Sequence, residues 1–137
     1  MKPGVNVDQL CPCGLPRPYA ECCGRWHQGP DHLQAPDPES LMRSRYSAYA
    51  LGKHDYVLAT WHPSTCPAGL QADPTGLTWL GLEVRRATLD DPDHGTVEFV
   101  ARSKHAGRAQ RLHEISRFVR ESGRWYYLDG SFPRKSG

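Results

Sequence analysis

The chain has 137 residues, which is enough for one ordinary domain with a small appendage. Its 17 basic and 15 acidic residues give a formal net charge of +2, so bulk electrostatics do not indicate a nucleic-acid-binding protein. No stretch approaches the roughly 18 apolar residues that span a bilayer, and the first residues, MKPGVNVDQL, lack the apolar run of a secretory signal. We therefore expect a cytoplasmic protein with no membrane span.

Four of the five cysteines lie close together near the start of the chain, at Cys11, Cys13, Cys22 and Cys23. In a reducing compartment, thiols grouped this closely are more often metal ligands or redox centres than disulfides. Pro12 fixes one backbone dihedral and Gly14 permits a tight turn, so that two neighbouring thiolates can converge on one ion. Four soft ligands in a closed tetrahedron are typical of structural zinc. The spacing therefore predicts one structural Zn²⁺ ion.

The identity of the fourth ligand stays open at this point. Adjacent side chains such as Cys22 and Cys23 point in different directions on a regular element, so both can bind one ion only over a bent backbone. His27 is the alternative, because it lies four residues after Cys23 and would share a helical face with it. Buried reduced thiols without metal are a further interpretation. A thioredoxin-type redox pair is disfavoured, since C-x-C lacks the C-x-x-C spacing.

Two helices are expected after this segment. Asp37 is a candidate cap with Pro38 in the first turn, and apolar side chains then recur at helical spacing until Gly52. A second, shorter helix should begin at residue 54 or 55 and run until Pro63. Residues 63–80 are rich in Pro and Gly and are expected to be mainly loop, with a short helix as the alternative.

Four strands should follow, in LGLEVRRATL (80–89), GTVEFVARSKH (95–105), RLHEISRFVRES (111–122) and RWYYLDG (124–130). A turn at Ser122 and Gly123 would connect the last two. Helices followed by a meander of antiparallel strands predict an α+β domain, which encloses a pocket if the sheet curls around the helices.

Alternation along the third strand divides its side chains between two faces. Glu114 shares a face with Ser116 and Phe118, whereas His113 and Arg117 lie on the other. One face must meet the helices, so we expect either Glu114 or the pair of His113 and Arg117 to be partly buried with a partner. Arg43 or Arg45 on the first helix could pair with Glu114.

The segment CPCGLPRPYAECCG resembles the SEC-C motif, the small zinc module known from the C-terminal tail of the SecA translocation ATPase. Leu15 and Pro16 replace the usual Ser-Gly pair of that motif. The matching positions are Cys11, Pro12, Cys13, Gly14, Tyr19, Cys22, Cys23 and Gly24. The resemblance implies that Cys23 is the fourth ligand. It also implies a protein partner in the secretion or translation machinery, such as the SecB chaperone or the ribosome, with nucleic-acid contact limited to ribosomal RNA.

The rest of the chain is similar to the YchJ-like family of uncharacterised bacterial proteins. The similarity is carried by LMRSRYSAYALGKHDYVLATWHPST (41–65) and LHEISRFVRESGRWYYLDG (112–130). It implies a main domain like the cones of nuclear transport factor two (NTF2), in which helices pack into a strongly curved antiparallel sheet. We therefore expect a zinc module at 1–30 and an NTF2-like domain at 31–137.

The favoured hypothesis is an interaction protein. A four-thiolate site leaves no open coordination position, so the metal should hold structure rather than catalyse a reaction. The module would present a surface to a protein partner. Arg17 and Arg25 lie around the site, and Tyr19 and Trp26 are candidates for exposed aromatic residues. The cone would then bind a second ligand or partner.

The alternative hypothesis is a small-molecule enzyme of the hydratase, isomerase or hydrolase type. His113 or His62 would act as general base beside Glu114 in the pocket, and a tyrosine would orient the substrate. Residues 30–137 contain no catalytic motif of fixed spacing, so the sequence favours binding over catalysis. The pocket candidates are Arg43, Arg45, Tyr46, Tyr49 and Arg117.

Simpler roles are expected for several conspicuous residues. His62 would be a polar cap at the end of the second helix, and Cys66 an incidental loop thiol. The C-terminal residues PRKSG would be a solvated tail. The aromatic residues expected in the core and between sheet neighbours are Trp61, Trp79, Trp125, Tyr126 and Tyr127.

Overall fold

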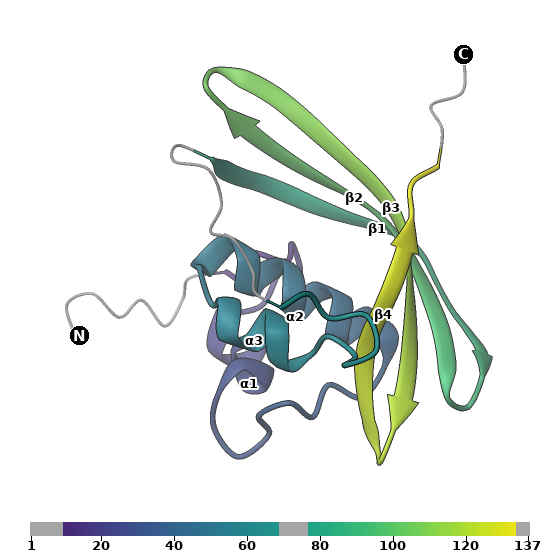
Figure 1. Cartoon of the computed structure of the whole chain (residues 1–137). Helices are drawn as coiled ribbons and strands as arrows, with labels where there is room; N and C mark the ends of the chain where they lie inside the picture. Colours follow the sequence, from purple (N-terminus) through teal and green to yellow (C-terminus); the bar gives the residue numbers. More distant parts are fainter. Residues whose placement is uncertain (1–9, 69–76, 134–137) are drawn as a thin grey trace.

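A computed structural model describes residues 10–68 and 77–133. Its C-terminal half is one four-stranded antiparallel sheet in the order β1-β2-β3-β4, and the helices lie together beside the sheet (Figure 1). The strands are β1 (Thr78–Asp91), β2 (His94–His105), β3 (Arg108–Glu121) and β4 (Arg124–Ser131). The predicted α+β class and the antiparallel meander are confirmed.

Irregular pairing bends the sheet. The register between β1 and β2 shifts at three places, and that between β3 and β4 shifts at Arg117 and Phe118. Such β-bulges bend a strand and increase its right-handed twist. In the view of Figure 1, the long strands overlap and run in different directions, as expected of a strongly twisted sheet. The predicted curvature is therefore present.

Two hairpin turns use residues in the left-handed region. Ser122 and Gly123 have φ values of 51° and 77°, and Ala106 and Gly107 have values of 53° and 78°. Two successive residues with positive φ form the type I′ turn, whose twist matches that of the flanking strands. The turn predicted at Ser122 is confirmed.

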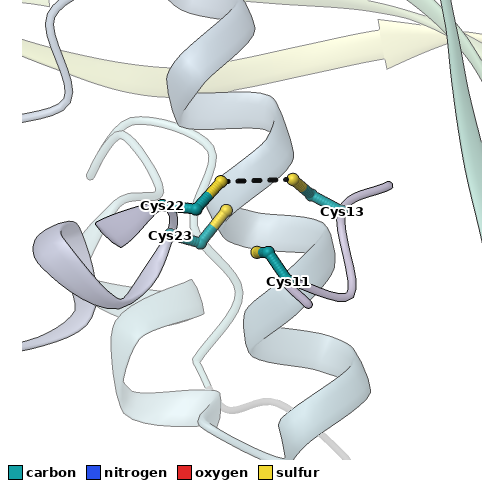
Figure 2. Close-up of side chains that lie close together, drawn as sticks. All are labelled: Cys11, Cys13, Cys22 and Cys23. Atoms are coloured by element: carbon teal, nitrogen blue, oxygen red, sulfur yellow. Dashed lines mark hydrogen bonds between the residues drawn. The ribbon is translucent and has the colours of Figure 1, made fainter. Parts of the chain in front are cut away.

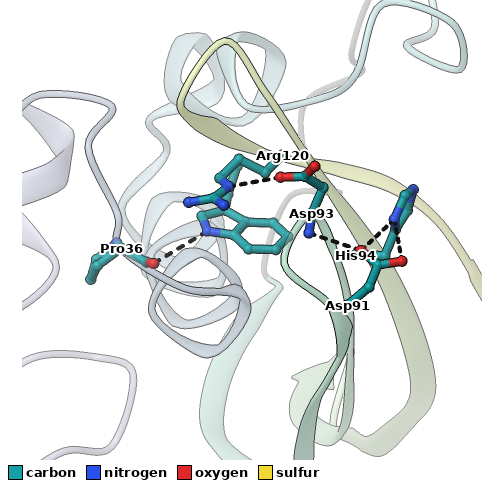
Figure 3. A network of polar contacts seen from close by, with 6 residues as sticks. Pro36, Asp91, Asp93, His94 and Arg120 are labelled. Atoms are coloured by element: carbon teal, nitrogen blue, oxygen red, sulfur yellow. Dashed lines mark hydrogen bonds and ion pairs between the residues drawn. The ribbon is translucent and has the colours of Figure 1, made fainter.

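A polar network fixes the turn between β1 and β2. Arg120 of β3 contacts the Asp93 carboxylate at 3.1 Å, and the Asp93 N–H donates to Asp91 at 2.8 Å (Figure 3). The Trp125 indole beneath Arg120 donates to the Pro36 carbonyl at 3.2 Å. This network joins the turn to the segment before the longest helix.

Helix α2 (Pro38–Leu51) begins and ends where its sequence predicts. The Asp37 side chain accepts a hydrogen bond from the Ser40 N–H at 2.7 Å, and Gly52 adopts φ 73° as the C-terminal cap. Short helical turns precede it, η1 (Tyr19–Glu21) and α1 (Gly24–His27). In the described residues, no helix is long and apolar enough to span a membrane.

Helix α3 (His54–Ala59) begins as predicted but ends earlier than Pro63. Beyond it, the Tyr127 N–H donates to the Thr60 carbonyl and the His62 N–H donates to the Tyr127 carbonyl, both at 2.8 Å. Trp61 thus forms a parallel bridge with β4. The backbone leaves the helix because strand β4 offers these hydrogen bonds, so His62 does not cap a helix.

The core lies between α2 and the concave face of the sheet. Leu41, Met42 and Tyr46 from α2 pack with Val97 and Phe99 of β2 in one buried cluster. On β3, the face with Glu114, Ser116 and Phe118 is the buried one. The prediction that a charged residue of this strand becomes buried is confirmed for Glu114.

Candidate metal centre and cone cavity

The four clustered cysteines point toward a common centre (Figure 2). Their sulfur atoms all lie within 4.8 Å of one another, and the Cys13 and Cys22 sulfurs are 3.6 Å apart. All four side chains are buried and reduced. A tetrahedron with zinc–sulfur bonds of about 2.3 Å has edges of about 3.8 Å. The group can therefore hold one metal ion.

Turns of the backbone bring the thiols together. The Gly14 N–H donates to the Cys11 carbonyl at 3.2 Å, and Gly14 adopts φ 95°. Cys22 has φ −125° and ψ −118°, so the backbone bends sharply between η1 and α1. This bend lets adjacent cysteines face one centre. Gly24 packs closely there, because a Cβ would lie 2.8 Å from the Tyr19 carbonyl oxygen.

The thiols influence one another's protonation. Hydrogen bonds from Cys13 and Cys23 lower the pKa of Cys11, whereas burial raises the pKa of Cys22 to about 12. Four thiolates buried together repel one another unless a cation neutralises them. A divalent cation such as zinc binds the deprotonated form and supplies that charge, so the donor set fits a thiophilic metal.

His27 does not face this centre. Its Nε2 atom is 2.8 Å from the Ser44 carbonyl oxygen, and its Nδ1 atom is 2.6 Å from the Tyr19 hydroxyl. Because only an N–H can donate to the carbonyl, Nδ1 is the acceptor for the tyrosine O–H. Burial lowers the pKa of His27, consistent with a neutral ring. Both ring nitrogens are thus engaged, Nδ1 with Tyr19 next to the cysteines and Nε2 with Ser44 on α2.

Further contacts join the cysteine module, defined here as residues 11–27, to α2. The Arg43 guanidinium donates to the Cys13 carbonyl at 2.8 Å and to Glu39 at 2.9 Å. The Ser47 hydroxyl lies 3.4 Å from the Cys11 sulfur. Arg43 therefore faces the module, which corrects its assignment to the pocket and its predicted pairing with Glu114.

A cavity of about 300 Å³ lies between the helices and the concave face of the sheet, and we call it the cone cavity. Of the predicted pocket residues, Arg45, Tyr46 and Tyr49 line it, together with Glu114. Other aromatic side chains in its wall are Trp61, Trp79, Phe99, Phe118, Tyr127 and Phe132. Three aromatic residues expected to pack in the core and on the sheet, Trp61, Trp79 and Tyr127, thus also line the cavity.

Glu114 is held by two hydrogen bonds on the same oxygen. Its Oε2 accepts from the Ser116 hydroxyl at 2.7 Å and from the Tyr127 hydroxyl at 2.9 Å. Gly130 lies directly against the carboxylate, and a Cβ there would overlap it. Burial and the neighbouring Glu114 charge raise the pKa of Tyr127, so its hydroxyl stays a donor. Sequence reasoning missed Tyr127 and Gly130, because their distance from Glu114 along the chain hides the contact.

Arg45 is a second buried charge beside the cavity. Its Nη1 donates to the Val57 carbonyl and to the Thr60 hydroxyl, both at 2.8 Å. Its guanidinium lies 4.5 Å from the Tyr127 ring centroid and 5.1 Å from that of Trp61. Burial lowers the pKa of Arg45, while the Glu114 charge acts to raise it. Arg45 thus contacts the end of α3 and two rings, in place of the direct pairing predicted with Glu114.

The remaining predicted site residues lie outside the cavity. His113 contacts Glu98 at 2.8 Å, and Arg117 contacts Asp129 at 2.6 Å, on the opposite face of β3 from Glu114. Two-residue alternation forces this separation. His62 contacts Glu121 at 2.9 Å, because the chain around it pairs with β4. The structure therefore does not bring either histidine beside Glu114, and the predicted combination is wrong.

The expected aromatic surface of the module is also wrong. Trp26 is only 9% exposed and belongs to the main core, with the Arg25 guanidinium 4.4 Å above its ring. Tyr19 is half-buried against His27. Removing these apolar ring surfaces from water lowers the free energy of the folded protein. Arg17 and Arg25 are both exposed. Cys66 is partly buried in the loop after α3, and the PRKSG tail lies largely outside the described residues.

Comparisons with known proteins give one consistent result. The family model "YchJ, middle NTF2-like domain" matches residues 37–130. The UPF0225 protein of Bordetella parapertussis is 57% identical over 130 residues, covering 95% of this chain and 98% of its own. That of Methylibium petroleiphilum is 63% identical over 120 residues, covering 88% of this chain and 86% of its own.

Two solved structures are similar along nearly the whole chain. A SEC-C motif containing protein from Rhodopseudomonas palustris has a TM-score of 0.80 and 35% identity, covering 92% of this chain and 100% of its own. Another from Psychrobacter arcticus has a TM-score of 0.76 and 30% identity, covering 96% and 86%. With its cysteine cluster and curved sheet, the chain therefore belongs to the UPF0225 family of bacterial proteins, and its residues 37–130 belong to the family of the YchJ middle NTF2-like domain.

Proposed function

We propose that this protein is a zinc-stabilised binding protein whose cone cavity receives a small molecule. The main support for this proposal is the cavity itself. It has a volume of about 300 Å³ and aromatic walls, and the buried side chains of Arg45 and Glu114 line it. Concave sites that are mostly apolar with a few placed polar groups are the usual sites for small ligands. In this proposal, residues 1–30 form the zinc module and residues 31–137 form the binding domain.

A cavity-filling substitution tests this function. Ala101 lines the cavity and is almost fully buried, so Ala101→Leu should fill part of the space and abolish binding of small fragments detected by ligand-observed NMR. Ala87→Leu is the matched control, because Ala87 is exposed on β1. Fragment binding that survives Ala101→Leu unchanged would place the site elsewhere.

We also propose that the four cysteines bind one Zn²⁺ ion with a structural role, with Cys23 as the fourth ligand. Support comes from the closed set of four buried sulfurs, which leaves no coordination position for a substrate. We expect about one zinc per chain, lost in Cys11→Ala together with the folding of the module. Cys66→Ser is the control and should keep the metal. A folded, metal-free module would overturn this assignment.

The surface of the module is a second candidate binding site. Arg17 and Arg25 are exposed beside the cysteines, and the SEC-C resemblance implies a protein partner in the secretion or translation machinery. We propose that such a partner, with SecB and the ribosome as the specific candidates, binds there in the cytoplasm. Titration of the full chain against SecB and against ribosomes tests this, and Arg17→Glu with Arg25→Glu should weaken the association. No association with either partner would remove this part of the proposal.

Catalysis is the second candidate function, since the buried Glu114 carboxylate faces the cavity and could serve as a general base. Binding is preferred because the histidines predicted to assist it lie outside the cavity. A ligand recovered chemically unchanged after long incubation supports binding. Its conversion, abolished by Glu114→Gln, would instead make the protein an enzyme.

A further inference from the structure

The aromatic walls of the cone cavity are arranged across the whole sheet. Trp79 lies on β1, and its ring is 5.6 Å from that of Tyr46 and 6.3 Å from that of Tyr49, both on α2. Tyr127 lies on β4, and its ring is 5.2 Å from that of Trp61. Because β1 and β4 are the two edges of the sheet, aromatic groups stand at both ends of the cavity. Such walls offer faces and edges of rings to a flat aromatic guest.

The size of the cavity limits that guest. Its volume of about 300 Å³ is at the lower end of the range for small-molecule sites. A water molecule occupies about 30 Å³ in the liquid, so the space corresponds to about ten waters. A guest of roughly ten to fifteen non-hydrogen atoms, such as a fused two-ring molecule, therefore fits the space.

The charges beside the cavity balance each other. Arg45 and Glu114 both line it and both are buried, with exposed fractions of 6% and 7%. An additional ion bound next to these two buried side chains would add a net charge to them, which is costly without a partner. A neutral guest preserves the balance.

One polar contact available to the guest is on Glu114. The hydrogen bonds that this carboxylate accepts from Ser116 and Tyr127 both end on Oε2. A carboxylate offers about four acceptor positions on its two oxygens. It thus retains capacity for an O–H or N–H donor from a molecule in the cavity.

We propose that the cone cavity binds an uncharged, flat aromatic molecule that donates one O–H or N–H hydrogen bond to Glu114. This inference rests on the proposed binding function and adds the chemical class of the ligand. Arg45 provides the compensating charge, and the aromatic pairs at the two edges of the sheet hold the ring system.

Four related probes test the inference on the zinc-loaded full chain: 2-naphthol, naphthalene, 2-naphthoate and 2-naphthylmethylammonium. They share a ring system but differ in charge and in the presence of a donor. Calorimetry or the indole NMR signals of Trp61 and Trp79 give the dissociation constants. We expect 2-naphthol to bind about ten-fold or more tightly than either ion, and more tightly than naphthalene.

Glu114→Gln should change the order of the affinities. It removes the negative charge beside Arg45, so 2-naphthoate should gain about ten-fold or more relative to 2-naphthol. Glu83→Gln, on the exposed side of β1, is the matched control and should leave the order unchanged. If Glu114→Gln does not fold, the order of the four affinities in the unaltered protein is sufficient to test the proposed ligand class.

Each contrary result has a separate meaning. Tighter binding of either ion than of 2-naphthol, or equal binding of naphthalene and 2-naphthol, would overturn the ligand class and leave the binding function standing. Absence of saturable binding by all four probes would overturn the ligand class, and the fragment experiment with Ala101→Leu would then decide the binding function.

Discussion

Gly130 shows how closely single residues are fitted around the cavity. A methyl group at this position would overlap the Glu114 carboxylate, which is held in place by Ser116 and Tyr127. Alternation along β3 predicted which face carries Glu114, because the period of a strand is a local property. The contact with Gly130 and Tyr127 depends on the register between β3 and β4, which the local pattern does not define.

Gly130→Ala should therefore destabilise the protein by about 1–3 kcal/mol, the usual range for inserting a group into a packed site. Gly81→Ala is the matched control, because nothing lies within 4 Å of the added Cβ and this glycine has no positive φ. Chemical denaturation measures both. Equal stability of the two variants would contradict the tight fit at Glu114.

His94 provides a titration test at the turn between β1 and β2. Its Nδ1 is 2.9 Å from the Asp91 carboxylate, which raises the pKa of His94 above its ordinary value of 6.5 (Figure 3). A raised pKa in the folded state stabilises the fold below the unfolded pKa, and this contribution disappears as the pH rises through the folded value. NMR titration should show a pKa above 6.5, and Asp91→Asn should lower it. A His94 that titrates below 6.5 in the unaltered protein would contradict the contact.

Helix α2 is the element that connects the two candidate sites. Arg43, Ser44 and Ser47 contact the cysteine module, whereas Arg45 and Tyr46 face the cavity. The sequence predicted the bounds of this helix, since its caps and Pro38 are local signals. It did not distinguish Arg43 from Arg45, because the direction of each side chain depends on where the module packs.

The N-terminal cap of α2 gives a prediction about the stability of this helix. Asp37→Ala removes the acceptor of the Ser40 N–H and should cost about 1 kcal/mol. Asp37→Asn keeps an acceptor oxygen and should retain most of the stability. Chemical denaturation of both variants checks this, and a stability loss in Asp37→Asn as large as that in Asp37→Ala would argue against a capping role.

The contact between the module and α2 separates the two candidate fourth ligands. His27→Gln should lower the stability by about 1–3 kcal/mol, because buried polar partners on Tyr19 and Ser44 lose their hydrogen bonds. This variant should retain about one zinc per chain, since the substitution removes no metal ligand. Cys23→Ser should lose the metal. Zinc retained in Cys23→Ser and lost in His27→Gln would make His27 the ligand.

At the scale of the whole molecule, the residue pattern predicted the succession of helices and the antiparallel meander, and the family resemblance implied the curvature of the sheet. Hydrophobic alternation and turn residues are local signals, so the four strands lie close to their expected positions. The early end of α3 was not predictable in the same way. It depends on hydrogen bonds between Thr60, His62 and Tyr127, which are distant in the chain. The burial of Trp26 likewise depends on how the module packs against the main core.

The central claim is that a metal-bound module holds α2 in place as one wall of a binding cavity. The most direct test compares amide NMR spectra of the zinc-loaded full chain with those after removal of the metal by a chelator. We expect the dispersed signals of residues 11–27 to be lost and those of Ser44, Tyr46 and Ser47 on α2 to shift, while the strands β2 and β3 keep theirs. A spectrum in which the module and α2 are unchanged after metal removal would contradict the claim.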